Sequence, residues 1–123
     1  MNAGIHHLTC DQGSTFRKTI TMKQSDGTTN VDLTGYTARM KIKEEYGGTL
    51  IKSLTSATGQ GLTVGGSAGT PTNGEIDIEI SATDTAAMTP NTIGVYDLEI
   101  ASSGGVVDRV LQGKFIITPE VTD

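Results

Sequence analysis

The sequence predicts an all-β protein, an antiparallel immunoglobulin-like β-sandwich of about seven or eight short strands. Apolar and polar residues alternate over several segments, and glycine-containing turns separate these segments. No segment has the pattern of a helix that would connect two parallel strands. A small β-barrel would give the same alternation and stays open as the alternative architecture.

The clearest pattern is a hairpin near the end of the chain, made of residues 94–101 and 106–118 and closed by the turn 102–105. Alternate residues of its first strand are large and apolar, and two of the residues between them are acidic, which is the period of a half-buried strand. The turn contains two glycines, which allow the positive φ angles of a tight hairpin. Gly113 interrupts the second strand, where we expect a β-bulge.

Earlier segments contain further strand patterns and one helix start. Strands are expected over residues 14–23, 36–43, 50–54, 62–64 and 75–80. Leu33 is expected to be a buried plug, and Ser81 is expected to cap a single helical turn. The basic outer residues of 36–43 and the acidic outer residues of 75–80 would support the register by cross-strand pairing if these two strands are neighbours.

The 123 residues are expected to form an N-terminal arm, residues 1–12, and a single sandwich domain, residues 13–123. The arm shows no sustained period, and we expect the domain to fold without it. A long loop is expected over residues 55–73, and a short tail over residues 119–123. The apolar residues of these segments are the candidate protein contacts: Ile5, Leu8, Leu62, Val64 and Val121.

Composition argues against several functional classes. The net charge is −5 and there is no extended basic cluster, so binding to nucleic acid is not expected. No segment has the roughly 20 apolar residues of a membrane helix, and the first residues do not resemble a signal peptide. Cys10 is the single cysteine, which fits a chain made in a reducing cytoplasm without a disulfide.

The residue patterns that carry enzyme or metal chemistry are weak. His6 and His7 are adjacent, and adjacent side chains of an arm do not converge on one ion. The acids of 75–80 share one face of a strand, where a solvated surface explains them. The glycine-rich segment 59–66 lacks the Gly-Lys-Ser/Thr ending of a phosphate-binding loop. We therefore expect a protein without enzymatic activity, catalytic residues, cofactor or metal.

Five short segments form an ordered series along the chain. They are Gln12-Gly-Ser-Thr-Phe16, Val31-Asp-Leu-Thr-Gly-Tyr36, Gly74-Glu-Ile-Asp-Ile-Glu-Ile80 with Thr85-Ala, Val95-Tyr-Asp-Leu-Glu-Ile100 and Val110-Leu-Gln-Gly-Lys-Phe115. This series resembles small structural proteins of tailed bacteriophages. It is also similar to the immunoglobulin-like N-terminal domain of phage upper baseplate proteins, from about residue 12 to residue 122.

The resemblance implies a virion structural protein made in the host bacterial cytoplasm. Such a protein would be a tail or baseplate adaptor that attaches fibre components by protein–protein docking. Its partners would be other virion proteins of the tail, baseplate or fibre, and it would form a homo-oligomer, for which a trimer is plausible by analogy. A capsid decoration protein bound to the major capsid protein is the alternative. A carbohydrate-binding module is a weaker alternative because the chain has few aromatic residues and no Trp.

Overall fold

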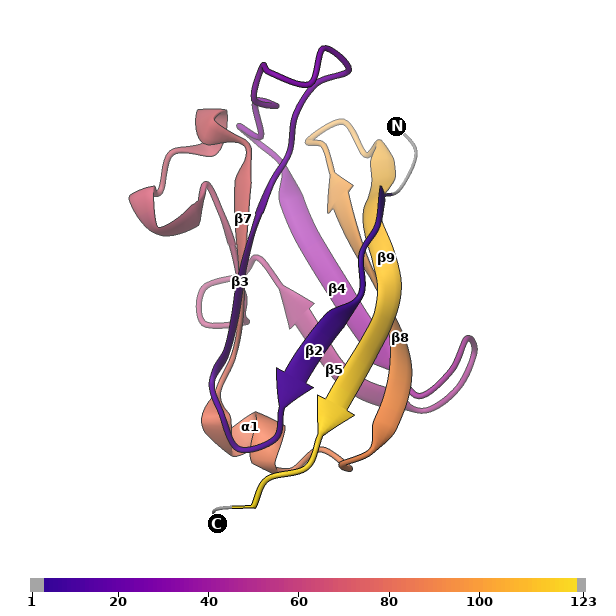
Figure 1. Cartoon of the computed structure of the whole chain (residues 1–123). Helices are drawn as coiled ribbons and strands as arrows, with labels where there is room; N and C mark the ends of the chain where they lie inside the picture. Colours follow the sequence, from indigo (N-terminus) through magenta and orange to yellow (C-terminus); the bar gives the residue numbers. More distant parts are fainter. Residues whose placement is uncertain (1–3, 122–123) are drawn as a thin grey trace.

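The computed structural model describes residues 4–121, which form two β-sheets packed face to face as a sandwich (Figure 1). The larger sheet, here sheet A, contains β1 (Gly4–Ile5), β2 (Leu8–Asp11), β9 (Val107–Thr118), β8 (Thr92–Ala101), β4 (Thr37–Lys43) and β5 (Leu50–Thr55). The smaller sheet, here sheet B, contains β3 (Phe16–Thr21), β7 (Glu75–Ile80) and β6 (Leu62–Val64). The prediction of an all-β sandwich is confirmed.

The strand order follows the immunoglobulin pattern. In sheet A the order is β9-β8-β4-β5, and in sheet B it is β3-β7-β6, which match strands G-F-C-C′ and B-E-D of that fold. The expectation of a purely antiparallel arrangement is wrong at one edge. There β1 and β2 run parallel to β9, the last strand of the chain. These strands do not form a hairpin with a sequence neighbour, which would make the pairing antiparallel.

Alternate residues of the strands fill the space between the two sheets. The burial of β4 and β8 alternates residue by residue, as the sequence predicts for half-buried strands. Leu33 is fully buried between the sheets, so the plug prediction is confirmed. The largest side chains with almost no exposure are Phe115, Leu33, Met40, Ile42, Ile76, Ile78, Ile80, Leu98 and Ile117.

The terminal hairpin has its bulge at a different position from the predicted one. Leu98 pairs with Leu111 and Glu99 with Arg109, which leaves Val110 as the extra residue of β9. Gly113 pairs regularly with Tyr96 and is not the bulge. A Cβ atom at position 113 would collide with the carbonyl oxygen of His6. The glycine therefore allows the N-terminal segment to approach β9 closely.

Charged strands pair differently from the arrangement considered from the sequence. Strand β4 lies between β5 and β8, whereas β7 lies between β3 and β6 in the other sheet. Arg39 of β4 therefore pairs with Glu99 of β8, at 2.8 Å between Nε and Oε1. Glu79 of β7 pairs with Arg17 of β3, at 2.7 Å. The first ion pair lies within sheet A and the second within sheet B, so neither joins β4 to β7.

The N-terminal segment is part of the sandwich, which corrects the predicted separate arm for its described residues. Strand β2 pairs with β9, and its inward residues Leu8 and Cys10 are 3% and 0% exposed. Leu8 thus belongs to the core and is not a free contact residue. Removing residues 1–9 would therefore open the core, contrary to the expectation that the domain folds without them. Residues 1–3 lie outside the described part of the chain.

The short strand expected at residues 62–64 within the long loop is confirmed as β6. Residues 55–73 also contain two 3₁₀ turns, η1 (Gly66–Ala68) and η2 (Pro71–Asn73). Leu62 is 3% exposed because it faces the core from β6, so its prediction as a contact residue is wrong. The helical turn is confirmed as α1 (Ala82–Ala86), where the backbone N–H of Asp84 donates to the Ser81 hydroxyl.

Candidate functional site

A groove lies on the open side of the sandwich, between the edge strands β5 and β6. It has a volume of about 720 Å³ and is open to solvent. Most of its lining groups are hydroxyl, amide and backbone groups, together with the half-buried ring of Tyr36. Lys52, Asp84 and Glu79 are its charged residues. This groove is the default location for a ligand.

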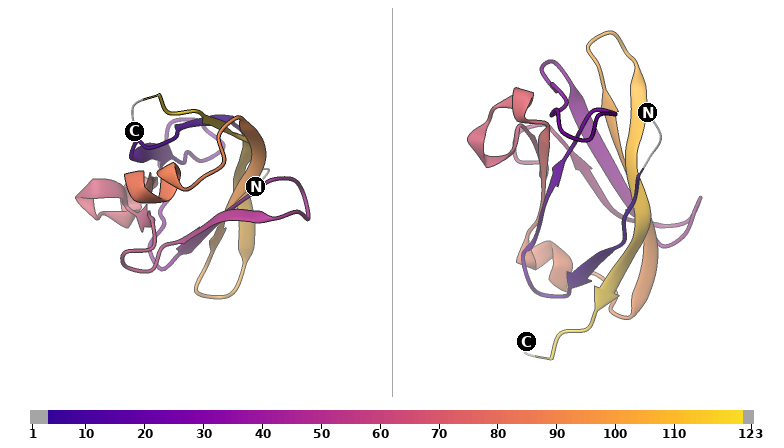
Figure 2. Two further views of the ribbon diagram at one scale, coloured as in Figure 1. Left: turned by 90° about the horizontal axis from the view of Figure 1, so that it is seen from below. Right: turned by 45° about the horizontal axis from the view of Figure 1, so that its top comes forward.

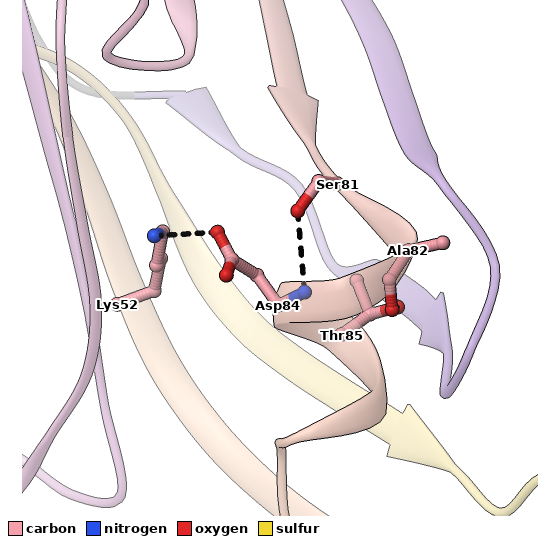
Figure 3. A network of polar contacts seen from close by, with 5 residues as sticks. All are labelled: Lys52, Ser81, Ala82, Asp84 and Thr85. Carbon is pink, nitrogen blue, oxygen red and sulfur yellow. Dashed lines mark hydrogen bonds and ion pairs between the residues drawn. The ribbon is translucent and has the colours of Figure 1, made fainter.

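An ion pair crosses the groove at one end and joins the two layers (Figure 3). Lys52 of β5 donates to a carboxylate oxygen of Asp84 on α1, at 2.8 Å. This hydrogen bond, followed by the lysine charge, lowers the pKa of Asp84 below its usual value. The ion pair therefore ties the edge of sheet A to the helical turn that follows sheet B.

The remaining polar groups around α1 also hold structural contacts. Thr85 is fully buried, and its hydroxyl donates to the carbonyl of Ser14 at 2.8 Å. The hydroxyl oxygen of Thr85 also accepts the backbone N–H of Gly13 at 3.1 Å. Gln12 donates to the carbonyl of Met88 at 3.0 Å. The polar side chains of this region are thus used to fasten α1 to the chain between β2 and β3.

On the opposite side of the sandwich, β2 and β3 border a smaller groove that contains both histidines. The side chain of His7 accepts the backbone N–H of Lys114 through Nδ1, at 3.0 Å. The backbone N–H of His6 donates to the carbonyl of Gln112, at 2.8 Å. Each histidine therefore supplies a contact that holds the N-terminal segment to β9. Within residues 4–121, no group of three or more metal-binding side chains converges.

Cys10 is the chain's single thiol, and it faces the core. Burial, followed by the charge of Asp11, raises the pKa of Cys10 to about 11. The thiol therefore stays protonated and covered at neutral pH, which makes it a poor nucleophile.

The predicted contact residues have different positions in the structure. Ile5 and Val121 are 73% and 95% exposed. Val64 is half-buried against the core. Ile5 lies on β1, next to the part of β9 that precedes Gly113, whereas Val121 follows the opposite end of β9. Residues 122–123 of the predicted tail lie outside the described part of the chain.

Other exposed apolar residues escaped the sequence analysis. Val106 lies in the turn between β8 and β9 and is 62% exposed, and Val107, the first residue of β9, is 46% exposed. Tyr46 is 79% exposed on the hairpin between β4 and β5, which projects away from sheet B beside β8 (Figure 2). Each stands in or beside a turn where the alternating pattern ends, so periodicity gives no signal for it.

No protein-family model matches the chain, and no curated protein sequence matches it. The structure contains no helix within residues 4–121 of the length and apolar character needed to cross a bilayer.

Proposed function

We propose that the chain is a non-enzymatic attachment module, a structural protein of a phage virion that links tail or baseplate to fibre components. One observation supports this proposal best. Exposed apolar side chains lie at separate places on the surface, toward both ends of the sandwich. Ile5, Val106 and Val107 lie along the half of β9 that precedes Gly113, and Val121 follows the other end of β9. An adaptor that joins two neighbours needs contact surfaces at two separate places.

The polar groups of the groove between β5 and β6 give a second line of support. The carboxylate of Asp84 is paired with Lys52, and the hydroxyl of Ser81 accepts a backbone N–H. The carboxylate of Glu79 is paired with Arg17. Contacts of this kind fasten neighbouring elements of a fold to one another. The sequence resemblance to phage structural proteins supplies the virion context of the proposal.

The proposal is tested by making charged substitutions at the two ends. Ile5→Asp and Val121→Asp place a carboxylate at exposed positions without opening the core. We expect both variants to fold and to be incorporated into particles less than the unchanged chain. Thr28→Asp, at an exposed position in the turn after β3, is the matched control and should assemble normally. Normal incorporation of both end variants would contradict the proposal.

Copy number separates the two virion positions. A decoration protein of the capsid would be present in hundreds of copies, and a tail adaptor in a few to tens. Quantitative mass spectrometry of purified particles measures this number directly.

Carbohydrate binding is a second candidate because of the groove between β5 and β6. The lining hydroxyl and amide groups are neutral hydrogen-bonding partners for a sugar, and Tyr36 supplies one aromatic ring. A glycan array tests this candidate. Binding that is lost in Tyr36→Ala and kept in the exposed Tyr46→Ala would support it, and an array without binding would reject it.

A further inference from the structure

We infer that copies of this chain associate through unlike faces, with the outer face of sheet A of one copy against the outer face of sheet B of the next. The observation behind this inference is a separation of charge between the two faces. The inference goes beyond the proposed function and does not rest on it, because it concerns how copies of the purified protein bind one another.

The outer face of sheet A is cationic, although the whole chain has a net charge of −5. Its outward rows include five of the nine lysines and arginines, against three carboxylates. The cations are Arg39, Lys41 and Lys43 of β4 with Arg109 and Lys114 of β9, and the carboxylates are Asp11, Asp97 and Glu99.

Two of these carboxylates are partly covered by arginines. Arg39 pairs with Glu99 at 2.8 Å, and Arg109 pairs with Asp97 at 3.3 Å. The side chain of Glu99 is 26% exposed while that of its arginine is 57% exposed. In both pairs the arginine side chain is more exposed to solvent than its carboxylate. The exposed charge of this face is therefore mainly positive.

The outer face of sheet B has the opposite sign. Strand β7 carries Glu75, Asp77 and Glu79 on its outward row, and β3 contributes Arg17 as the one outward cation of this sheet within the described strands. The two outer faces look in opposite directions because they belong to two packed layers (Figure 2). One copy thus presents a positive face on one side and a negative face on the other.

A second copy is the occupant that this arrangement favours. Two copies with a charge of −5 repel each other in most orientations, but unlike faces attract and fix one relative orientation. The hairpin between β4 and β5 borders the cationic face with Tyr46, above a trough of about 400 Å³. Glu44 and Glu45 of this hairpin are exposed directly after β4 and lower the positive charge at this edge of the face. A contact between unlike surfaces is heterologous, so it generates a ring or an open stack.

Charge reversal on each face tests the inference. Lys43→Glu with Lys114→Glu makes the first variant, and both positions pair with Val95, so no like-charged neighbour faces them across the strands. Glu75→Lys with Asp77→Lys makes the second variant. Sedimentation velocity at about 10 mM salt, where the Debye length is about 30 Å, reports self-association of each protein.

We expect the unchanged chain to form species larger than a monomer at low salt and to dissociate at about 1 M salt, where screening is strong. Each variant alone should be monomeric, because its two faces now have the same sign. An equimolar mixture of the two variants should associate again, and so should one chain carrying all four substitutions. The matched control, Lys18→Glu with Lys23→Glu, changes the net charge as much as the first variant but leaves both faces intact, and it should self-associate.

The inference is overturned if the unchanged chain is monomeric at low salt, if either variant self-associates like it, or if the mixture stays monomeric. Circular dichroism verifies that each variant is folded. The chain with all four substitutions shows whether association is lost through the change of charge or through misfolding, because it carries every substitution but has faces of opposite sign again. Particle incorporation does not enter this experiment, so its result and that of the proposed function stand apart.

Discussion

Tyr96 and Gly113 lie opposite each other on β8 and β9, and together they hold one carbonyl group of the N-terminal segment. The hydroxyl of Tyr96 donates to the carbonyl of His6 at 2.5 Å. The missing side chain of Gly113 leaves the space in which that carbonyl lies. Strands β1 and β2 pair with β9 on either side of this point. The first and last strands are thus locked together by a contact from a third strand.

Gly113→Ala should destabilise the fold by about 1–3 kcal/mol, the usual cost of forcing an extra methyl group into a packed site. The added Cβ would collide with the carbonyl oxygen of His6, and the N-terminal segment would move away from β9. Urea unfolding measures the change in the free energy of unfolding. Gly104→Ala is the control, because the nearest atom to its Cβ is a serine oxygen at 3.8 Å. Equal stability of the two variants would contradict this account of Gly113.

Tyr96→Phe should destabilise the fold by about 1 kcal/mol or somewhat more, because it removes a hydrogen bond and leaves the His6 carbonyl without that donor. Tyr96 is 3% exposed, so water does not easily replace the hydroxyl. Burial also raises the pKa of Tyr96 to about 12, which keeps the donor protonated. Tyr46→Phe, at a position that is 79% exposed, should leave the unfolding midpoint unchanged. Loss of stability in both variants would point to a general effect of removing a hydroxyl.

Cys10 should not react with a thiol reagent at pH 8 while the protein is folded. Its pKa of about 11 keeps the thiolate population small, and its side chain is fully covered. Adding denaturant should expose the thiol, so the labelling rate should rise with the unfolded fraction. Fast labelling of the native protein would show that β2 separates from β9 in solution.

The Lys52–Asp84 ion pair should make a small contribution to stability that disappears in acid. The folded pKa of Asp84 is lowered by Lys52, so the contribution is present above the unfolded pKa, about 3.9. It is lost as the pH falls through the lower folded value. Asp84→Asn keeps the backbone N–H that Ser81 accepts but cannot be ionised.

The measurement for this ion pair is the difference in melting temperature between the unchanged chain and Asp84→Asn at several pH values. Taking the difference removes the contribution of Asp26, whose pKa is lowered to about 2 mainly by its hydrogen bond from the Thr29 hydroxyl. The two melting temperatures should differ most near neutral pH and converge in strong acid. A difference that stays constant over the whole range would contradict the role given to the ion pair.

Lys18→Val should increase aggregation through the free edge of β3. Lys18 lies opposite Ile78 in the inward row of β3, between Phe16 and Ile20, yet it is exposed. A charge at such a position discourages another strand from pairing with the edge. Light scattering during heating measures the aggregation of Lys18→Val. The control is Lys23→Val, at a position that lies beyond the end of β3. Similar scattering from both variants would contradict the protective role of Lys18.

Local alternation was enough to predict most strands, because burial of one sheet face determines the identity of every second residue. Tyr96 could be assigned to the inner face in this way, but its partner could not, since His6 lies 90 residues away. Leu8 and Cys10 do alternate with polar neighbours. Their segment of four residues is too short for the pattern to separate a strand from an irregular arm.

Strand order explains the other differences between prediction and structure. Arg39 of β4 finds its partner Glu99 on β8, which the pattern of either strand alone does not specify. Lys18 interrupts the apolar inward row of β3, and the structure shows how the fold accommodates it, since an edge strand lets an inward side chain reach solvent. The Lys52–Asp84 contact depends on how the two sheets are stacked, which no local pattern contains.

The most direct test of the proposed attachment function is a density map of an intact particle in which this chain is located. We expect neighbouring proteins to cover both ends of the sandwich, with Ile5 and Val121 in separate contacts. A particle that lacks the chain, or one in which both ends face solvent, would contradict the proposal.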